Sequence, residues 1–195
     1  SVMSGVEQSI GAYLGNSREA FFFADDGRDE RTLLHEATHQ LFHESRPVAP
    51  DVGVRSNFWI VEGIALYMES LHQENGFYVL GGFDDLRMLA ARYRFLHDDF
   101  YVPLADLTAM GREAIQTHPR IATLYSQAAG LTHFLISHDG GRYRDALVAY
   151  LGDVYSSRAD ASTLAQFTGT PYAELDRQYR AFIQSAGMPE LAAEK

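Results

Sequence analysis

The segment His35-Glu36-Ala37-Thr38-His39 constrains the fold more than any other part of this sequence. Two histidines four residues apart lie about one turn from each other on the same face of an α-helix. Apolar residues on both sides of the segment, Leu33-Leu34 and Leu41-Phe42, predict a partly buried helix over residues 29–45. A buried cluster of His, Glu and His needs partners that offset its desolvation, and a metal ion is one such partner.

The same spacing suggests the chemistry of that metal. In an HExxH pattern on a helix, two imidazoles hold Zn²⁺ and the glutamate, here Glu36, is the general base for a metal-activated water. The alternative is a solvated polar helix face that carries two histidines. His43 lies one further turn along, but His35 and His43 are separated by about 12 Å of helix rise, too far for one shared ion. The glycine turn of metzincins is also missing, so we expect His43 to have a structural or supporting role.

A second candidate ligand lies in an apolar stretch. Glu62 is the only charged residue between Phe58 and Met68, in a segment that predicts a helix over residues 57–73 with Asn57 as its N-cap. An unpaired carboxylate in such a helix would be costly. Facing the first helix, Glu62 would complete a His₂Glu site with an open fourth position, and Gly63 would let another backbone approach closely. The alternative is that Glu62 pairs with a nearby arginine.

The rest of the chain predicts an α+β fold that is mainly α, with a small N-terminal sheet and a helical C-terminal part. No linker divides the chain, so we expect one domain over residues 1–195. Beyond the two helices above, the expected elements are a short helix at 4–14, a strand at 19–24, a turn at 25–27, a strand at 77–80, helices at 84–98, 120–138, 141–156 and 160–167, and a last helix that starts at Thr170-Pro171.

Composition excludes several function classes. The 16 Lys and Arg against 26 Asp and Glu give a net charge of −10, which argues against nucleic acid or an anionic membrane as the main partner. The absence of cysteine excludes disulfides, thiolate metal sites and a cysteine nucleophile. No run of about 18 apolar residues predicts a transmembrane helix. The chain begins at Ser1 rather than Met, so we expect a domain trimmed from a longer chain, and we favour an exported protein although no leader is visible.

The two motifs together resemble a known group. Residues 32–42, followed by the pattern Trp-x-x-Glu-Gly-x-Ala-x-Tyr from Trp59, resemble the gluzincin zinc metallopeptidases, and most closely the bacterial peptidase-MA-like domains. Segments 125–135 and 172–182 are similar as well. The resemblance implies a zincin-like fold, a peptide or protein substrate, and Zn²⁺ held by His35, His39 and Glu62. It also implies hydrolysis of a peptide bond with Glu36 as the general base.

The resemblance extends to one further residue and also has gaps. Gluzincins add an oxyanion donor from a later helix, a role expected here of Tyr125. The carboxylate that some of them place one turn after the third ligand is replaced by Ala65 and Leu66, so Glu69, two turns on, is the candidate to support the histidines. Only a short sheet precedes the motif. The alternative functions are a zinc-stabilised module that binds a peptide or protein with little or no catalysis, and a hydrolase that acts on a non-peptide amide.

Overall fold

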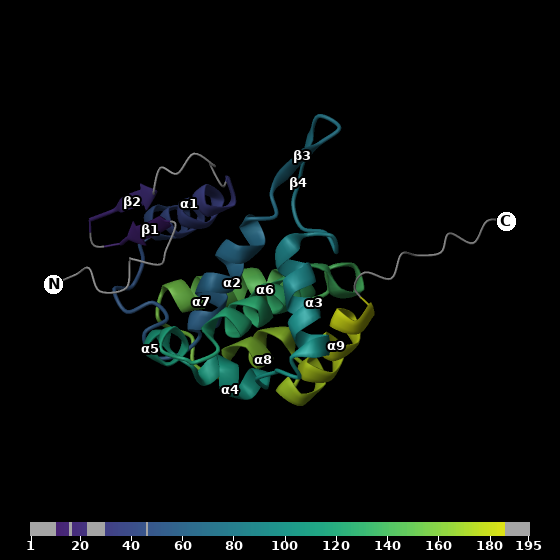
Figure 1. The fold of residues 1–195 in the computed structure, drawn as a ribbon. Coiled ribbons are helices and arrows are strands. Elements are labelled where there is room, and N and C mark those ends of the chain that lie inside the picture. Colours follow the sequence, from purple (N-terminus) through teal and green to yellow (C-terminus); the bar gives the residue numbers. More distant parts are fainter. Residues whose placement is uncertain (1–10, 16, 23–29, 46, 186–195) are drawn as a thin grey trace.

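The computed structural model describes residues 11–15, 17–22, 30–45 and 47–185 of the chain. These residues form a mainly helical α+β fold with two small antiparallel hairpins, which confirms the expected class (Figure 1). None of the helices in these ranges is both long and apolar enough to cross a bilayer. The elements are β1 (Gly11–Leu14), β2 (Glu19–Phe22), α1 (Glu30–Glu44), α2 (Phe58–Met68), β3 (His72–Glu74), β4 (Phe77–Val79), α3 (Leu86–His97), α4 (Leu104–Ala109), α5 (Arg112–Gln116), α6 (Ile121–Ser137), the 3₁₀ turn η2 (His138–Gly140), α7 (Arg144–Tyr155), α8 (Thr163–Thr168) and α9 (Tyr172–Ser185).

The first hairpin packs on α1. Strands β1 and β2 pair antiparallel, with Tyr13 opposite Ala20, and Figure 1 shows them beside α1 on one side of the helical body. The contact is close, because a Cβ atom at Gly11 would lie 2.8 Å from Thr32 Cγ2 and 3.0 Å from Glu36 Cγ. A glycine at this position therefore lets β1 reach the helix face that carries Glu36.

Helix α2 is the centre of the helical body. Nine of its eleven residues are buried, and it packs along α6 and also against α1. A Cβ at Gly63 would come within 2.5 Å of Thr132 Oγ1 and 3.1 Å of the Ala128 carbonyl oxygen, both on α6. The expectation that Gly63 permits a close backbone approach is confirmed.

The core extends from α2 across α3, α6, α7 and α9. It is rich in aromatic side chains, which bury large areas and stack on one another. The largest fully buried ones are Trp59, Phe134, Tyr143, Tyr150, Tyr155 and Tyr179. This core fixes α2 and α6 rigidly, and these helices carry Glu62 and Tyr125.

Several expected elements need correction. Residues 11–14 form strand β1, so the helix expected at 4–14 is wrong there; residues 4–10 and the turn at 25–27 lie outside the described part. Helix α2 ends at Met68 rather than 73, because β3 starts at His72. Two short helices, α4 and α5, were not expected, since six and five residues are too few to show a helical period.

Asn57 precedes α2 as expected but does not cap it through its side chain. Its amide instead donates to the Asp160 carbonyl oxygen at 3.0 Å, and its Oδ1 accepts from the Tyr150 hydroxyl at 2.7 Å. Asn57 has a φ of 60°, in the left-handed region that asparagine tolerates better than most residues. The side chain thus ties the start of α2 to α7 and the segment after it.

The close packing at Gly63 predicts the sign of the change in unfolding free energy when this glycine is replaced by alanine. In an unobstructed helix, Gly→Ala stabilises the fold by about 1 kcal/mol. Here the added methyl group would collide with Thr132 and the α6 backbone, so we expect Gly63→Ala to lower the free energy of unfolding by about 1–3 kcal/mol. Urea unfolding followed by circular dichroism measures the change. An increase in stability would show that α6 does not lie where the structure places it.

Candidate metal centre

Helices α1 and α2 lie side by side and bring the three expected ligands together. One ligand atom each from His35, His39 and Glu62 lies within 4.8 Å of the other two. The two Nε2 atoms of the histidines are 3.2 Å apart. His35 Nε2 lies 3.5 Å from Glu62 Oε2, and His39 Nε2 lies 3.9 Å from Glu62 Oε1. The three residues are therefore arranged as candidate ligands of one metal ion.

The distances can be compared with those of a tetrahedral site. Metal–ligand bonds of about 2.0–2.2 Å at tetrahedral angles place ligand atoms about 3.3–3.6 Å apart. The observed separations lie around this range, and the three side chains are only 15%, 12% and 12% exposed. Two imidazole nitrogens and one carboxylate oxygen are a donor set that suits Zn²⁺ and leaves a fourth position open.

A second carboxylate orients the first ligand. Glu69 Oε1 accepts a hydrogen bond from His35 Nδ1 at 2.8 Å, and Arg87 in turn donates to both Glu69 oxygens at 2.7 and 3.0 Å. Because Nδ1 is bound in this way, Nε2 is the nitrogen that faces the other ligands. Glu62 and Glu69 are seven residues apart, two helical turns, and so lie on one face of the chain at α2. The expected contact between Glu69 and a histidine of the motif is confirmed.

The charges of the cluster are set by burial and by close partners. Burial alone would lower the pKa of His35, but hydrogen bonds to Glu62 and Glu69 outweigh it and raise that pKa to about 9. Burial lowers the pKa of His39 to about 4. Burial would raise the pKa of Glu62, yet the hydrogen bond from His35 and the nearby imidazoles bring it below its usual value. Near neutral pH, before a metal ion binds, His35 and Glu62 are thus a charged pair.

Glu36 lies next to the cluster without belonging to it. The residue is buried, and its carboxylate accepts a hydrogen bond from the backbone N–H of Tyr13 on β1. Burial raises the pKa of Glu36, while the charge of His35 opposes that shift. The N-terminal hairpin therefore holds Glu36, the acidic residue of the His35–His39 segment, which is not one of the three candidate ligands.

Tyr125, on α6, interacts with the same cluster. Burial raises the pKa of its phenol, and the charge of Glu62 and a hydrogen bond with it raise the pKa further. Glu36 adds a smaller effect of the same sign. The structure thus brings Tyr125 beside Glu62, although these residues are far apart in the sequence.

Two other histidines lie outside the cluster, as expected of His43. His43 packs between the rings of Tyr13 and Tyr155, with centroids 5.4 and 5.7 Å away, and is not one of the three clustered residues. His133 is buried in the core, with Nε2 3.4 Å from Asp85 Oδ2. Neither faces the metal site as a ligand.

Two arginines near the site gave no signal in the sequence. Arg87 bonds Glu69, and Arg112 lowers the pKa values of Glu62 and His39 by its charge. Among the residues that the structure describes, the ion-pair partners of Glu62 are His35 and His39, and no arginine lies within ion-pair distance of it, which favours the ligand interpretation over the Glu62–arginine pair. The sequence does not indicate a role for Arg112, because α5 is too short to show a helical period.

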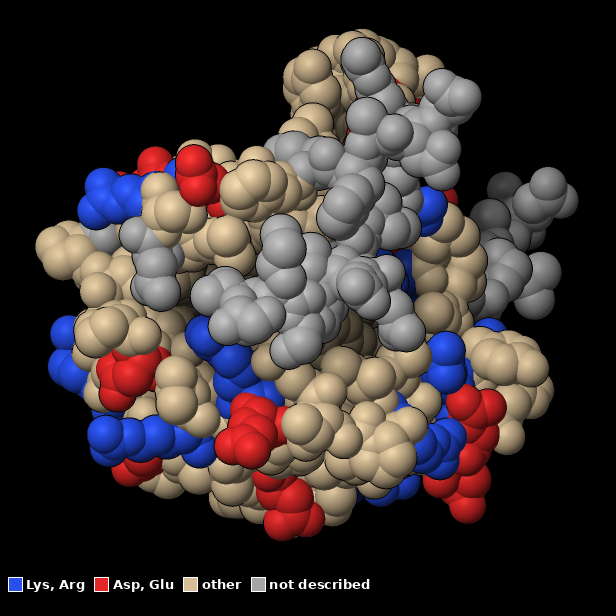
Figure 2. Space-filling model, turned by 60° about the vertical axis from the view of Figure 1, so that its left-hand side comes forward, with Lys and Arg blue, Asp and Glu red and all other residues tan. Residues whose placement is uncertain are grey.

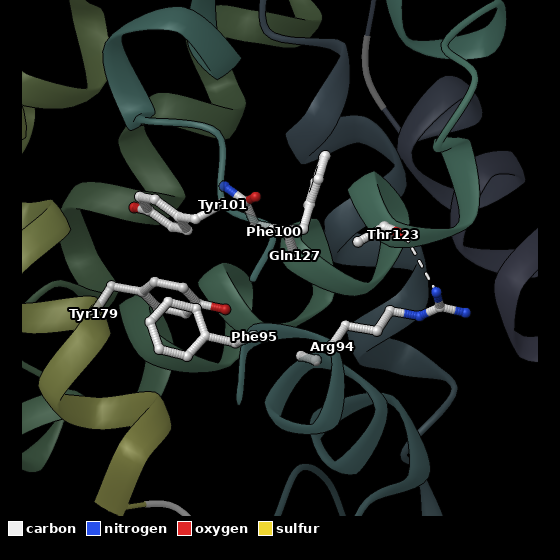
Figure 3. A pocket seen from close by; sticks show the side chains of 8 residues that line it. Arg94, Phe95, Phe100, Tyr101, Thr123, Gln127 and Tyr179 are labelled. Atoms are coloured by element: carbon white, nitrogen blue, oxygen red, sulfur yellow. Dashed lines mark hydrogen bonds between the residues drawn. The ribbon is translucent and has the colours of Figure 1, made fainter. Parts of the chain in front are cut away.

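Two cavities elsewhere in the structure are not lined by histidines. The one in Figure 3 lies among aromatic side chains such as Phe95, Tyr101 and Tyr179, and its volume of about 10 Å³ holds at most about one water molecule. The other, about 400 Å³, is lined by residues 51–57 and 154–161 and contains no histidine. On the face in Figure 2, basic and acidic side chains are interspersed among uncharged ones, without an extended basic surface.

Comparison with known proteins places the chain in a family. Residues 29–159 match the family model described as "Protein of unknown function (DUF1570)". The chain belongs to the DUF1570 family. The matched range of this DUF1570 chain contains all three clustered residues together with Glu36, Glu69 and Tyr125. No curated protein and no solved structure gives a significant match.

The pKa values predict that metal binding expels a proton. At pH 6.0 His35, with a pKa of about 9, is protonated, whereas His39, with a pKa of about 4, is neutral, and Glu62 is ionised. A ligating imidazole must be neutral, so we expect about one proton released per zinc, and an affinity that increases as pH rises toward 9. Calorimetry in buffers of different ionisation enthalpy measures the release. At this pH a zinc-bound water with a pKa near 7 contributes little.

The role of Glu69 is tested in protein that already carries Glu36→Gln. This substitution removes any contribution of the Glu36 carboxyl group, whose pKa is raised, to the measured proton release. Adding Glu69→Gln lowers the pKa of His35, so we expect less proton release and a metal affinity about 10- to 100-fold weaker. Glu74→Gln is the matched control, because the Glu74 side chain is 62% exposed and its carboxylate also lies near a histidine, 3.9 Å from His72 Nε2. Equal proton release with and without the Glu69→Gln substitution would contradict the assigned role.

Proposed function

We propose that this DUF1570 chain is a gluzincin-type zinc metallopeptidase. The observation that carries the proposal is the convergence of His35, His39 and Glu62 with Glu36 held beside them. The sequence motifs, the His₂Glu donor set and the Glu69 carboxylate on His35 all support zinc as the ion. The substrate class that follows is a peptide or protein.

Each side chain has a role in the proposed reaction. Zinc, when bound, supplies a Lewis acid and lowers the pKa of a water molecule. Glu36 accepts the proton of the attacking water and then passes it to the leaving amine. The burial that raises the pKa of Glu36 makes the carboxyl group a better proton acceptor than an exposed glutamate.

Tyr125 is the proposed donor to the oxyanion. Its raised pKa keeps the phenol protonated near neutral pH, so the hydroxyl can donate a hydrogen bond. The hydrogen bond with Glu62 supports a position of that hydroxyl beside the three proposed ligands. A donor aimed at developing negative charge stabilises the transition state more than the ground state.

The competing proposal is a zinc-stabilised module that binds a peptide or protein. The observation that favours it is the N-terminal sheet, which has only two short strands in the described part. Such a sheet offers little edge for holding an extended substrate. The presence of Glu36 favours the enzyme, because a purely structural site does not need this residue.

Two substitutions separate metal binding from hydrolysis. Glu62→Ala leaves two histidines as ligands, so we expect zinc content to decrease from about one per chain to substoichiometric levels. Glu36→Gln should retain zinc and the fold but abolish cleavage, because the amide cannot accept the proton. Metal analysis and digestion of a peptide library measure both. Unchanged turnover in Glu36→Gln would reject the mechanism, and a zinc-loaded wild type that cleaves nothing would favour the binding module.

Removing the Tyr125 hydroxyl tests the oxyanion role. Loss of one oxyanion donor typically lowers turnover about 10²- to 10³-fold, and we expect Tyr125→Phe to have this effect on kcat with little change in zinc content or Tm. Tyr101→Phe is the matched control, since its half-buried phenol donates to Asp176, which is not among the three clustered residues. Full activity in Tyr125→Phe would assign the residue to packing.

A further inference from the structure

Arg112 stands at the start of α5, next to the metal site. Its guanidinium lies over the Phe58 ring, 5.4 Å from the centroid, and its Nη2 donates to the Val52 carbonyl oxygen at 3.2 Å. Phe58 lies one turn before Glu62 on α2. Helix α5 packs against both α2 and α6, the helices that carry Glu62 and Tyr125.

The charge of Arg112 acts on the site but is not neutralised by an acidic partner. It lowers the pKa values of His39, Glu62 and Tyr125. No carboxylate in the described ranges lies within ion-pair distance of it, unlike Arg87, whose guanidinium binds Glu69. Among the described residues, one of its five N–H donors has a hydrogen-bond acceptor, the Val52 carbonyl oxygen. An exposed cation is thus held beside the proposed reaction centre, with donors left for a ligand.

We propose that Arg112 binds a carboxylate of the peptide substrate and so determines specificity. The inference rests on the proposed peptidase function and names its substrate class as peptides with a carboxylate near the scissile bond. The planar guanidinium matches a carboxylate with two parallel hydrogen bonds. The net charge of −10 means that the protein as a whole repels an acidic peptide, and a local cation would oppose that repulsion.

The carboxylate has two sources, the C-terminus of the substrate and an Asp or Glu side chain. Three peptides of otherwise identical sequence separate them: one with a free C-terminus and Glu, one with a C-terminal amide, and one with Gln in place of Glu. We expect the zinc-loaded wild type to prefer one carboxylate roughly 10- to 100-fold in kcat/KM. Arg112→Gln should abolish that preference, and Arg112→Lys should retain part of it.

The matched control is Arg180→Gln. Arg180 also lies over an aromatic ring, 4.3 Å from the centroid of Tyr101, but on α9 in another part of the core. A merely structural Arg112 would change Tm without changing the ratio between the peptides. Equal cleavage of acidic and neutral peptides by wild type, or an unchanged ratio in Arg112→Gln, would overturn the proposal.

A binding measurement decides the point without hydrolysis. Succinate and its monoamide differ by one carboxylate, and we expect zinc-loaded Glu36→Gln protein to bind succinate roughly 10- to 100-fold more tightly. Calorimetry should show that this difference disappears when Arg112→Gln is added. Retention of the difference would reject the carboxylate site. Wild type without peptidase activity would reject the proposed function instead, while the succinate comparison would still decide the role of Arg112.

Discussion

The burial of one carboxylate in an apolar helix is the constraint on which the rest of the site depends. Glu62 is 12% exposed on α2, most of whose residues are buried. A charge in that setting needs compensation, and the two imidazoles of α1 lie 3.5 and 3.9 Å from it. The pairing explains why the pKa of His35 is raised and that of Glu62 lowered. A bound cation would replace the proton on His35 and compensate the same carboxylate.

The geometry around the ligands is fixed by residues from other elements. Glu69 follows the last turn of α2 and Arg87 lies in α3, so the hydrogen bonds from His35 through Glu69 to Arg87 join three helices. A surface ion pair contributes little to stability, but the Glu69 side chain is only 4% exposed. A buried carboxylate that is hydrogen-bonded to both His35 and Arg87 holds the His35 ring in one orientation, which a metal site requires. The same contacts therefore join the helices and hold the His35 ring in an orientation that suits metal binding.

The motif residues that are not ligands are held by two peripheral elements. The hairpin β1–β2 reaches Glu36 through the Tyr13 backbone N–H, at a point where Gly11 permits close packing on α1. Helix α5 holds Arg112 over Phe58 on the side of α2 and α6. A carboxylate and a cation are therefore held near the three clustered residues by different elements. The proposed roles of Glu36 and Arg112 depend on this arrangement.

The sequence alone predicted that His35, His39 and Glu62 come together, and it predicted the main helices. Histidines four residues apart and a lone glutamate in an apolar stretch favoured a shared site, and the helical periods of α1, α2, α3 and α6 are long enough to recognise. Tertiary structure decided the rest. Strand β1 is too short to distinguish from a helix by pattern, Asn57 bonds distant partners instead of its own helix, and α5 has no detectable period. The positions of Tyr125 and Arg112 beside Glu62 depend on how α5 and α6 pack on α2, and such long-range packing leaves no local pattern in the chain.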